Sequence, residues 1–122
     1  MKYLCLIYFD EQELYARPQK DLDRLMDEHE AFNRDITQSG HLLGTDPLEP
    51  VKDTTTVRVR NGKLWATDGP FAETKEQLCG YYLIDARDLN EAIQLASRIP
   101  AIRLGAVEVR PIKELTHSNV RQ

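Results

Sequence analysis

The 122-residue sequence predicts a single α+β domain of the ferredoxin-like kind, an antiparallel sheet with its helices on one face. Two observations predict this class. The patterns follow one another as strand, long helix, hairpin, strand, helix and strand, which amounts to two βαβ-like halves. The length suffices for one hydrophobic core but not for two. We therefore expect one domain over residues 1–122, with a loosely held tail from about residue 113.

The first predicted strand, Lys2 to Phe9, is apolar on both of its faces. A strand with this pattern is typically buried on both sides. One layer of helices covers only one face of a sheet, so another surface must cover the second face, near which Tyr81, Tyr82 and Trp65 are expected to add large side chains. We expect a homodimer in which the sheets of two copies pack against each other.

The first helix is predicted between Pro18, which suits a first helical turn, and Gly40, which suits a helix end. His29 follows Leu25 by four residues and therefore lies on the apolar, inward stripe of this helix. A histidine on such a stripe is more often a satisfied core residue than a functional one, and both interpretations remain open.

A β-hairpin is the clearest local signal in the chain. Asn61-Gly62 between two β-rich runs predicts a two-residue type I′ turn. The turn fixes the register, which pairs Thr55 with Asp68 at the far end. Asp68 is then predicted on the apolar face of the hairpin, and that face is expected to lie against the inward stripe that carries His29.

The second half repeats the pattern of strand, helix and strand. The stretch "LCGYYLIDA" is predicted as a strand, and Asp88 with Glu91 forms a capping box for the next helix. That helix is expected to end before Pro100. Pro111 places the last strand, "GAVEVRPI", at an edge of the sheet or at its own end.

Charge, apolar stretches and the few cysteines and histidines exclude several classes of protein. A net charge of −4 without a basic block argues against nucleic acid as a partner. The longest apolar stretch is too short to span a bilayer and no signal peptide is indicated, so we expect no membrane partner and a cytoplasmic location. Cys5 and Cys79 lie in apolar runs and are expected to be reduced thiols. The histidines show no metal-ligand spacing, so neither a metal nor another cofactor is expected.

Acid–base chemistry is the most specific function that these residues suggest. Asp68 and His29 are the candidate catalytic residues: the carboxylate would hold one ring nitrogen and raise the pKa of the imidazole, leaving the other nitrogen to move a proton. The alternative for Asp68 is an Asx-type turn that satisfies nearby backbone amides and nothing more.

The loop after Asp68 is the candidate ligand-binding segment. Gly69 would let a ligand approach the backbone, Pro70 would stiffen the turn and Phe71 would anchor the loop in the core. Glu73 and Lys75 complete the set of candidate ligand-binding residues. The alternative for these two charges is that they are solvated loop charges or form local ion pairs.

Four segments resemble the YCII-related family, specifically its DGPF-domain branch: "MKYLCLIYFDE", "TDGPFAETKEQLCGYYLIDA", "EAIQLASRIP" and "VEVRPI". The resemblance covers the chain from Met1 to about Ile112 and implies a dimeric α/β barrel. It also implies a cleft between helix and sheet with an aspartate and a helical histidine as an active pair. Asp68 corresponds to that aspartate through the Asp-Gly-Pro-Phe motif, and His29 is the histidine of the first helix.

Two functions of different classes follow from the resemblance. A distant YCII-like member resembles a lyase that eliminates chloride from a chlorinated ring compound, which suggests a cofactor-independent enzyme for elimination or isomerisation of a small molecule. Proteins of the DGPF branch are often encoded beside extracytoplasmic-function sigma factors. This suggests, as the alternative, a dimeric metabolite-binding or regulatory module linked to that signalling. A purely structural role for the motif is the third possibility.

Overall fold

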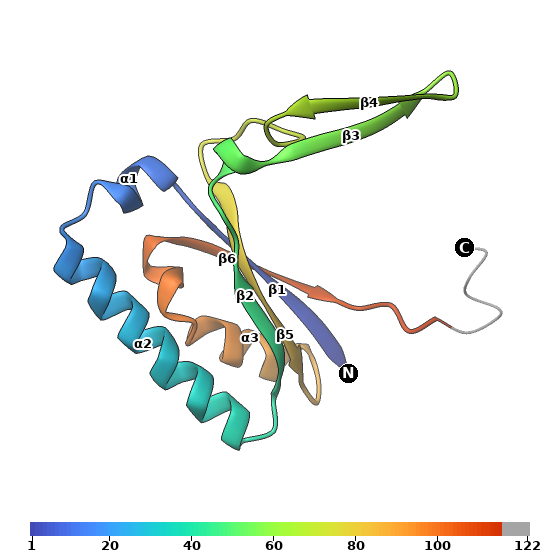
Figure 1. Ribbon diagram of the computed structural model, residues 1–122. Helices are drawn as coiled ribbons and strands as arrows, with labels where there is room; N and C mark the ends of the chain where they lie inside the picture. The colour runs from blue at the N-terminus through green and yellow to red at the C-terminus, as the bar shows by residue number, and fades with distance from the viewer. Residues whose placement is uncertain (116–122) are drawn as a thin grey trace.

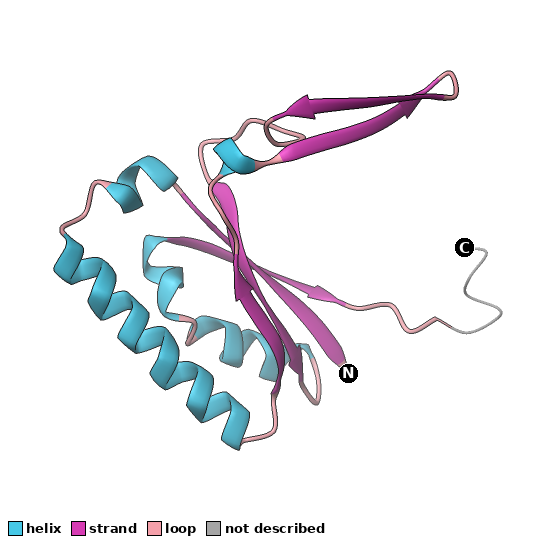
Figure 2. Cartoon of the chain, viewed as in Figure 1, coloured by secondary structure: helices cyan, strands magenta, loops and turns pink. Residues whose placement is uncertain are grey.

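The computed structural model describes residues 1–115 and shows an α+β body with a projecting hairpin (Figures 1 and 2). The body holds an antiparallel four-stranded sheet in the order β2-β5-β1-β6. Its strands are β1 (Lys2–Phe9), β2 (Leu42–Pro47), β5 (Gln77–Asp85) and β6 (Gly105–Pro111). The described chain has three α-helices, α1 (Glu11–Tyr15), α2 (Gln19–Gln38) and α3 (Leu89–Ser97), and they lie on one face of this sheet. The predicted α+β class is confirmed.

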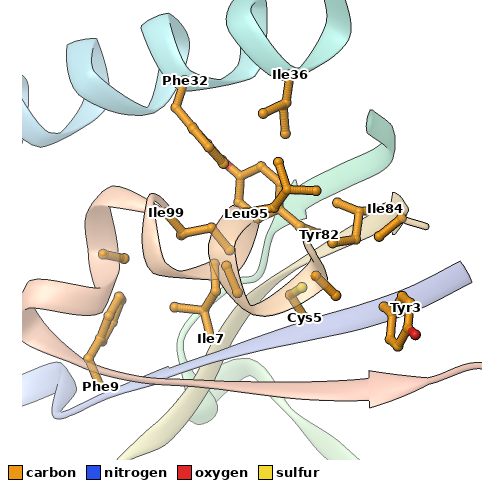
Figure 3. Packing of buried hydrophobic residues seen from close by; sticks show 14 of the residues in the cluster. Tyr3, Cys5, Ile7, Phe9, Phe32, Ile36, Tyr82, Ile84, Leu95 and Ile99 are labelled. Atoms are coloured by element: carbon orange, nitrogen blue, oxygen red, sulfur yellow. The ribbon is translucent and has the colours of Figure 1, made fainter. Parts of the chain in front are cut away.

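The core fills the space between the helices and this sheet (Figure 3). Side chains of β1 at alternate positions point toward the helices, and each is at most 8% exposed: Tyr3, Cys5, Ile7 and Phe9. They pack with fully buried side chains of the other elements, such as Ile36 and Ile99. The thiols of Cys5 and Cys79 are free, as predicted.

Within residues 1–115 no helix lies against the second face of the four-stranded sheet, which we call the open face. It carries the other set of apolar side chains, all half-buried: Leu4, Leu6, Tyr8, Tyr81 and Leu83. The expectation that Tyr82 lies near this face with Tyr81 is wrong, because strand alternation turns Tyr82 toward the helices, where it is 3% exposed.

A hairpin of residues 55–68, which we call the arm, forms a separate two-stranded sheet from β3 (Thr55–Arg60) and β4 (Lys63–Asp68). Asn61 and Gly62 both have positive φ, at 52° and 73°, as a type I′ turn requires. The pairs include Thr55 with Asp68, so the predicted register is confirmed. The arm projects from the body on the side away from the helices (Figure 1).

The predicted helix boundaries hold closely. α2 begins directly after Pro18 and ends shortly before Gly40. The side chain of Asp88 caps α3 by accepting a hydrogen bond from the amide of Glu91 at 2.9 Å. The sequence did not predict α1, a five-residue helix capped by Asp10.

Two shorter elements complete the body. The 3-10 turn at Val51–Asp53 joins the base of the arm to α1, because the Val51 amide donates to Glu11 Oε1 at 3.1 Å. A second 3-10 turn, Pro100–Leu104, leads into β6. The predicted loose tail falls largely on residues 116–122, which lie outside the described residues.

Candidate functional site

A cleft of about 480 Å³ lies between α2 and the edge of the four-stranded sheet formed by β2 and β5. Its walls are largely apolar, with Leu14, Leu22, Leu25 and Met26 among them. The polar side chains that line it include His29 and Asn33 from α2 and Tyr82 from β5. An apolar cleft with a few convergent polar groups is the usual form of a small-molecule site.

Three of these polar side chains form a chain of hydrogen bonds. The Tyr82 hydroxyl donates to Asn33 Oδ1 at 2.5 Å, and it lies 3.0 Å from His29 Nδ1. A tyrosine hydroxyl has one proton, and here the hydroxyl donates it in the hydrogen bond to Asn33 Oδ1. The hydroxyl oxygen therefore acts as the acceptor in its contact with His29 Nδ1. His29 must then carry its proton on Nδ1. Its Nε2 then carries the lone pair, and His29 is one of the residues that line the cleft.

Burial keeps both members of the central contact uncharged near neutral pH. Desolvation is the largest cause and lowers the pKa of His29 below its ordinary value of 6.5, while the Glu28 carboxylate raises this pKa and the Arg103 guanidinium lowers it. Desolvation likewise raises the pKa of the Tyr82 phenol, so that this group keeps its proton. The expectation that an aspartate raises the pKa of His29 is therefore wrong for the single chain.

Asp68 lies in the arm, away from this network. Its carboxylate is exposed, and within residues 1–115 it takes part in no hydrogen bond or ion pair. It is not among the residues that line the cleft, so one chain does not bring Asp68 and His29 together. The register did place Asp68 on the apolar face of the hairpin, but that face does not lie against α2. The expectation that the apolar face carrying Asp68 packs on the stripe with His29 is therefore wrong for the single chain.

The comparisons with known proteins match nearly the whole part of the chain that the structure describes. The profile of the YCII-related domain matches residues 1–116. The chain belongs to the YCII-related family. A relative, the uncharacterized protein R00369 of Rhizobium meliloti (strain 1021), is 38% identical over 114 residues, which cover 92% of each chain. In the described part of this YCII-related protein, no helix combines the length and apolar character needed to cross a membrane.

The loop after Asp68 in this YCII-related protein packs against the base of the arm rather than the cleft. The Gly69 amide donates to the Thr54 carbonyl at 2.7 Å, and Pro70 follows in a half-buried position. Phe71 is 76% exposed and lies 4.9 Å from the Arg58 guanidinium, so the prediction that it anchors the core is wrong.

None of the five predicted loop residues lines the cleft of the single chain, and the two charged ones, Glu73 and Lys75, are exposed. The alternative interpretation of Asp68, a turn that caps nearby amides, is not found either. Within the described residues no loop amide donates to its carboxylate.

Sequence reasoning missed Asn33 and Tyr82, the two residues that orient His29. A signal for each was present. Asn33 follows His29 by four residues, so the two side chains lie on one face of the helix. Tyr82 lies at a position of β5 that points toward the helices, two residues after Gly80, which also lines the cleft. Their pairing depends on the distance between α2 and β5, which the sequence pattern does not give.

Proposed function

We propose that this protein is a cofactor-independent enzyme that transfers a proton on a small molecule, in an elimination or an isomerisation. The cleft beside α2 is the proposed site, and His29 is the proposed base. The observation that carries the proposal is the hydrogen bond from His29 Nδ1 to the Tyr82 hydroxyl, which itself donates to Asn33 Oδ1. A neutral imidazole with one nitrogen held and the other left as an acceptor suits abstraction of a proton at neutral pH.

The surroundings of His29 support this role. Apolar side chains limit water around a bound molecule, which strengthens each polar contact made to it. The lowered pKa keeps His29 in its basic form, and the network fixes the plane of its ring. Tyr82 and Asn33 are positioning residues in this proposal, since they act through His29.

Asp68 enters the proposal as the second acid–base group, on the strength of the family resemblance alone. Within one chain it lies on the exposed arm, so a direct pair with His29 requires a second copy or a rearrangement of the arm. The loop residues Gly69, Pro70, Phe71, Glu73 and Lys75 are ligand contacts in this proposal only under the same condition.

We further propose that the chain belongs to the DGPF branch and forms a ferredoxin-like, dimeric α/β barrel in the cytoplasm. The Asp68-Gly69-Pro70-Phe71 motif supports the branch. The strand order β2-β5-β1-β6 with helices on one face supports the ferredoxin-like arrangement. The open face, with its half-buried leucines and tyrosines, supports association through the sheet.

The alternative is a dimeric metabolite-binding or regulatory module linked to extracytoplasmic-function sigma factor signalling. The exposed arm favours it, because a projecting ribbon offers a surface on which a partner protein can bind. In this alternative the cleft binds its ligand without changing it.

Deuterium exchange separates the two functions even while the substrate is unidentified. The purified protein is incubated in D₂O with a panel of small hydroxy, keto and halogenated ring compounds, and mass spectrometry measures deuterium incorporated at carbon. An isomerase returns a solvent deuteron to carbon, whereas an elimination expels the leaving group and gives an unsaturated product, and the same mass spectra detect both outcomes. We expect deuterium incorporation or loss of the leaving group with the wild type and with His41→Gln, the control at the other described histidine, and neither with His29→Gln. Compounds that bind but neither acquire deuterium nor lose a leaving group would support the binding module instead.

Tyr82→Phe tests the positioning network directly. Nitrogen NMR of the His29 ring should show the Nδ1–H tautomer in the wild type and a mixture of tautomers in the variant, because the acceptor for Nδ1–H is gone. Loss of this buried contact should lower the free energy of unfolding by about 1–3 kcal/mol. Tyr81→Phe is the control, since the Tyr81 hydroxyl donates to Asp46 at 2.6 Å outside the network. An unchanged tautomer in Tyr82→Phe would contradict the assignment.

A further inference from the structure

The arm leaves an apolar face uncovered. One side of its ribbon carries four apolar side chains, all exposed, which we call the arm's apolar face: Val57, Val59, Leu64 and Ala66. A two-stranded ribbon by itself is at best marginally stable in water and needs a third strand or a packing surface. An exposed apolar face of this kind usually marks an interaction site.

The direction of the arm indicates which surface meets it. The arm projects away from the helices, on the side of the open face (Figure 1). A second copy seated on the open face would therefore lie beside the arm. Because two identical copies related by a two-fold axis exchange the same contacts, each arm would reach the other copy.

The length of the arm fits this arrangement. Each strand of the arm has six residues. At about 3.3 Å per residue the arm reaches roughly 20 Å, whereas packed sheets lie about 10 Å apart. The arm therefore extends past the interface between two stacked sheets and along the body of the second copy.

The charge of the arm fits a second copy as well. Three cations, Arg58, Arg60 and Lys63, and one carboxylate, Asp68, give residues 55–68 a net charge of +2 in a chain whose net charge is −4. The remainder of a second copy therefore carries a net charge of −6, since the arm accounts for +2 within the total of −4. Opposite net charge favours the approach of the arm to a second copy. The cations themselves lie on the face of the ribbon opposite Val57 and Val59, so they stay in water when the apolar face docks.

We propose that the arm is a clasp between two copies of this chain, with its apolar face packed on the body of the second copy. This inference rests on the proposed dimer and adds to it the surface that holds the pair together. Asp68 shares the apolar face with Val57, at the base of the arm. Docking therefore covers the Asp68 carboxylate with groups of the second copy, which a single chain does not supply.

The test compares two double variants that each replace one β-branched residue with threonine and one leucine with glutamine. Val59→Thr with Leu64→Gln removes the apolar character of the arm, where these side chains are 68% and 67% exposed. Ile93→Thr with Leu89→Gln makes the matched change on α3, in the helical layer, where they are 50% and 51% exposed. Sedimentation measures the dimer dissociation constant of each. We expect a dimer for the wild type and the α3 variant, and at least about tenfold weaker association for the arm variant.

Amide hydrogen exchange of residues 55–68 supplies the second measurement. Protection of the arm amides should increase with protein concentration across the dissociation constant of the wild type, and should be lost in the arm variant. A wild type that stays monomeric at micromolar concentration would overturn the clasp together with the dimer. Neither result bears on the deuterium-exchange test of His29.

A third variant separates the clasp from the sheet interface. Leu6→Lys places a charge on the open face and should dissociate a dimer that packs sheet on sheet. If this variant dissociates while the arm variant associates as tightly as the α3 control, the dimer stands and the clasp is wrong.

Discussion

The body and the arm follow the same rule of strand alternation and end in opposite environments. In β1 every second side chain is buried beneath the helices. In the arm the matching set of Val57, Val59 and Leu64 is 60–68% exposed. Alternation thus decides which side chains share a face, whereas the neighbouring elements decide whether that face is covered. Matched substitutions in the body and in the arm test this contrast.

The largest effect is expected at Gly105, where β6 begins beside β1. A Cβ added there would overlap the Tyr8 carbonyl oxygen and lie 2.9 Å from Phe9 Cα. Both are backbone atoms of the neighbouring strand, so no side-chain movement relieves the clash. We expect Gly105→Ala to cost more than about 4 kcal/mol and to prevent pairing of β1 with β6. Urea denaturation followed by circular dichroism measures the loss.

The matched change in the arm is Gly62→Ala. Gly62 has a positive φ of 73° but no atom within 4 Å of an added Cβ. Gly62→Ala should therefore destabilise only through the left-handed backbone conformation, by about 1–2 kcal/mol, and only the arm should lose stability. If the two variants unfolded with equal loss, the arm would be as integral to the fold as the central sheet.

A smaller effect is expected from truncating one apolar side chain in each region. Ile36 is fully buried in the core, so Ile36→Ala should lower the free energy of unfolding by about 3 kcal/mol. Val59→Ala should change it by less than about 0.5 kcal/mol in a dilute, monomeric sample, because this side chain is exposed there. Chemical denaturation at several protein concentrations tests both.

The concentration series also connects this comparison to the clasp. At concentrations where two copies associate, Val59→Ala should become costly, while the cost of Ile36→Ala should stay nearly constant. A cost above about 1.5 kcal/mol for Val59→Ala in the monomer would contradict the exposed position of the arm's apolar face.

The same contrast explains how far the sequence could predict this molecule. Local chemistry sufficed for the turn at Asn61-Gly62, the register from Thr55 to Asp68 and the bounds of α2. Each depends on residues that are near one another in sequence. It also sufficed to place His29 on the inward stripe of its helix, where the structure has it.

Predictions that depended on distant packing were less successful. The face that carries Asp68 was identified correctly, but its neighbour was taken to be the His29 stripe, whereas the arm projects away from it. Phe71 was expected in the core and is exposed. The positioning of His29 by Tyr82 crosses 53 residues of sequence, and only the packing of α2 on β5 creates it.

The smallest effect concerns the pH dependence of stability, and it again distinguishes the two regions. The arm contains no histidine, whereas the body holds His29 half-buried with a lowered pKa. Burial disfavours the charged imidazole, so the unfolded chain binds a proton at a higher pH than the folded one. The contribution of neutral His29 to the free energy of unfolding is therefore fully present above pH 6.5, the ordinary pKa of the unfolded chain. This contribution is lost as the pH falls toward the lower pKa that His29 has in the folded chain.

His29→Gln should remove this loss, so the free energy of unfolding should fall less steeply with pH just below 6.5 than in the wild type. Carboxylates with lowered pKa, such as Glu28 beside Arg103, lose their contribution only as the pH falls below their ordinary value of 4.5, so the two windows are separate. His41, which lies 3.3 Å from Glu91, serves as the control through His41→Gln. Urea denaturation from pH 7.5 to 5 measures the slopes. A wild type and a His29→Gln variant with the same slope would show that burial does not favour the neutral ring, and His29 would lose its standing as the proposed base.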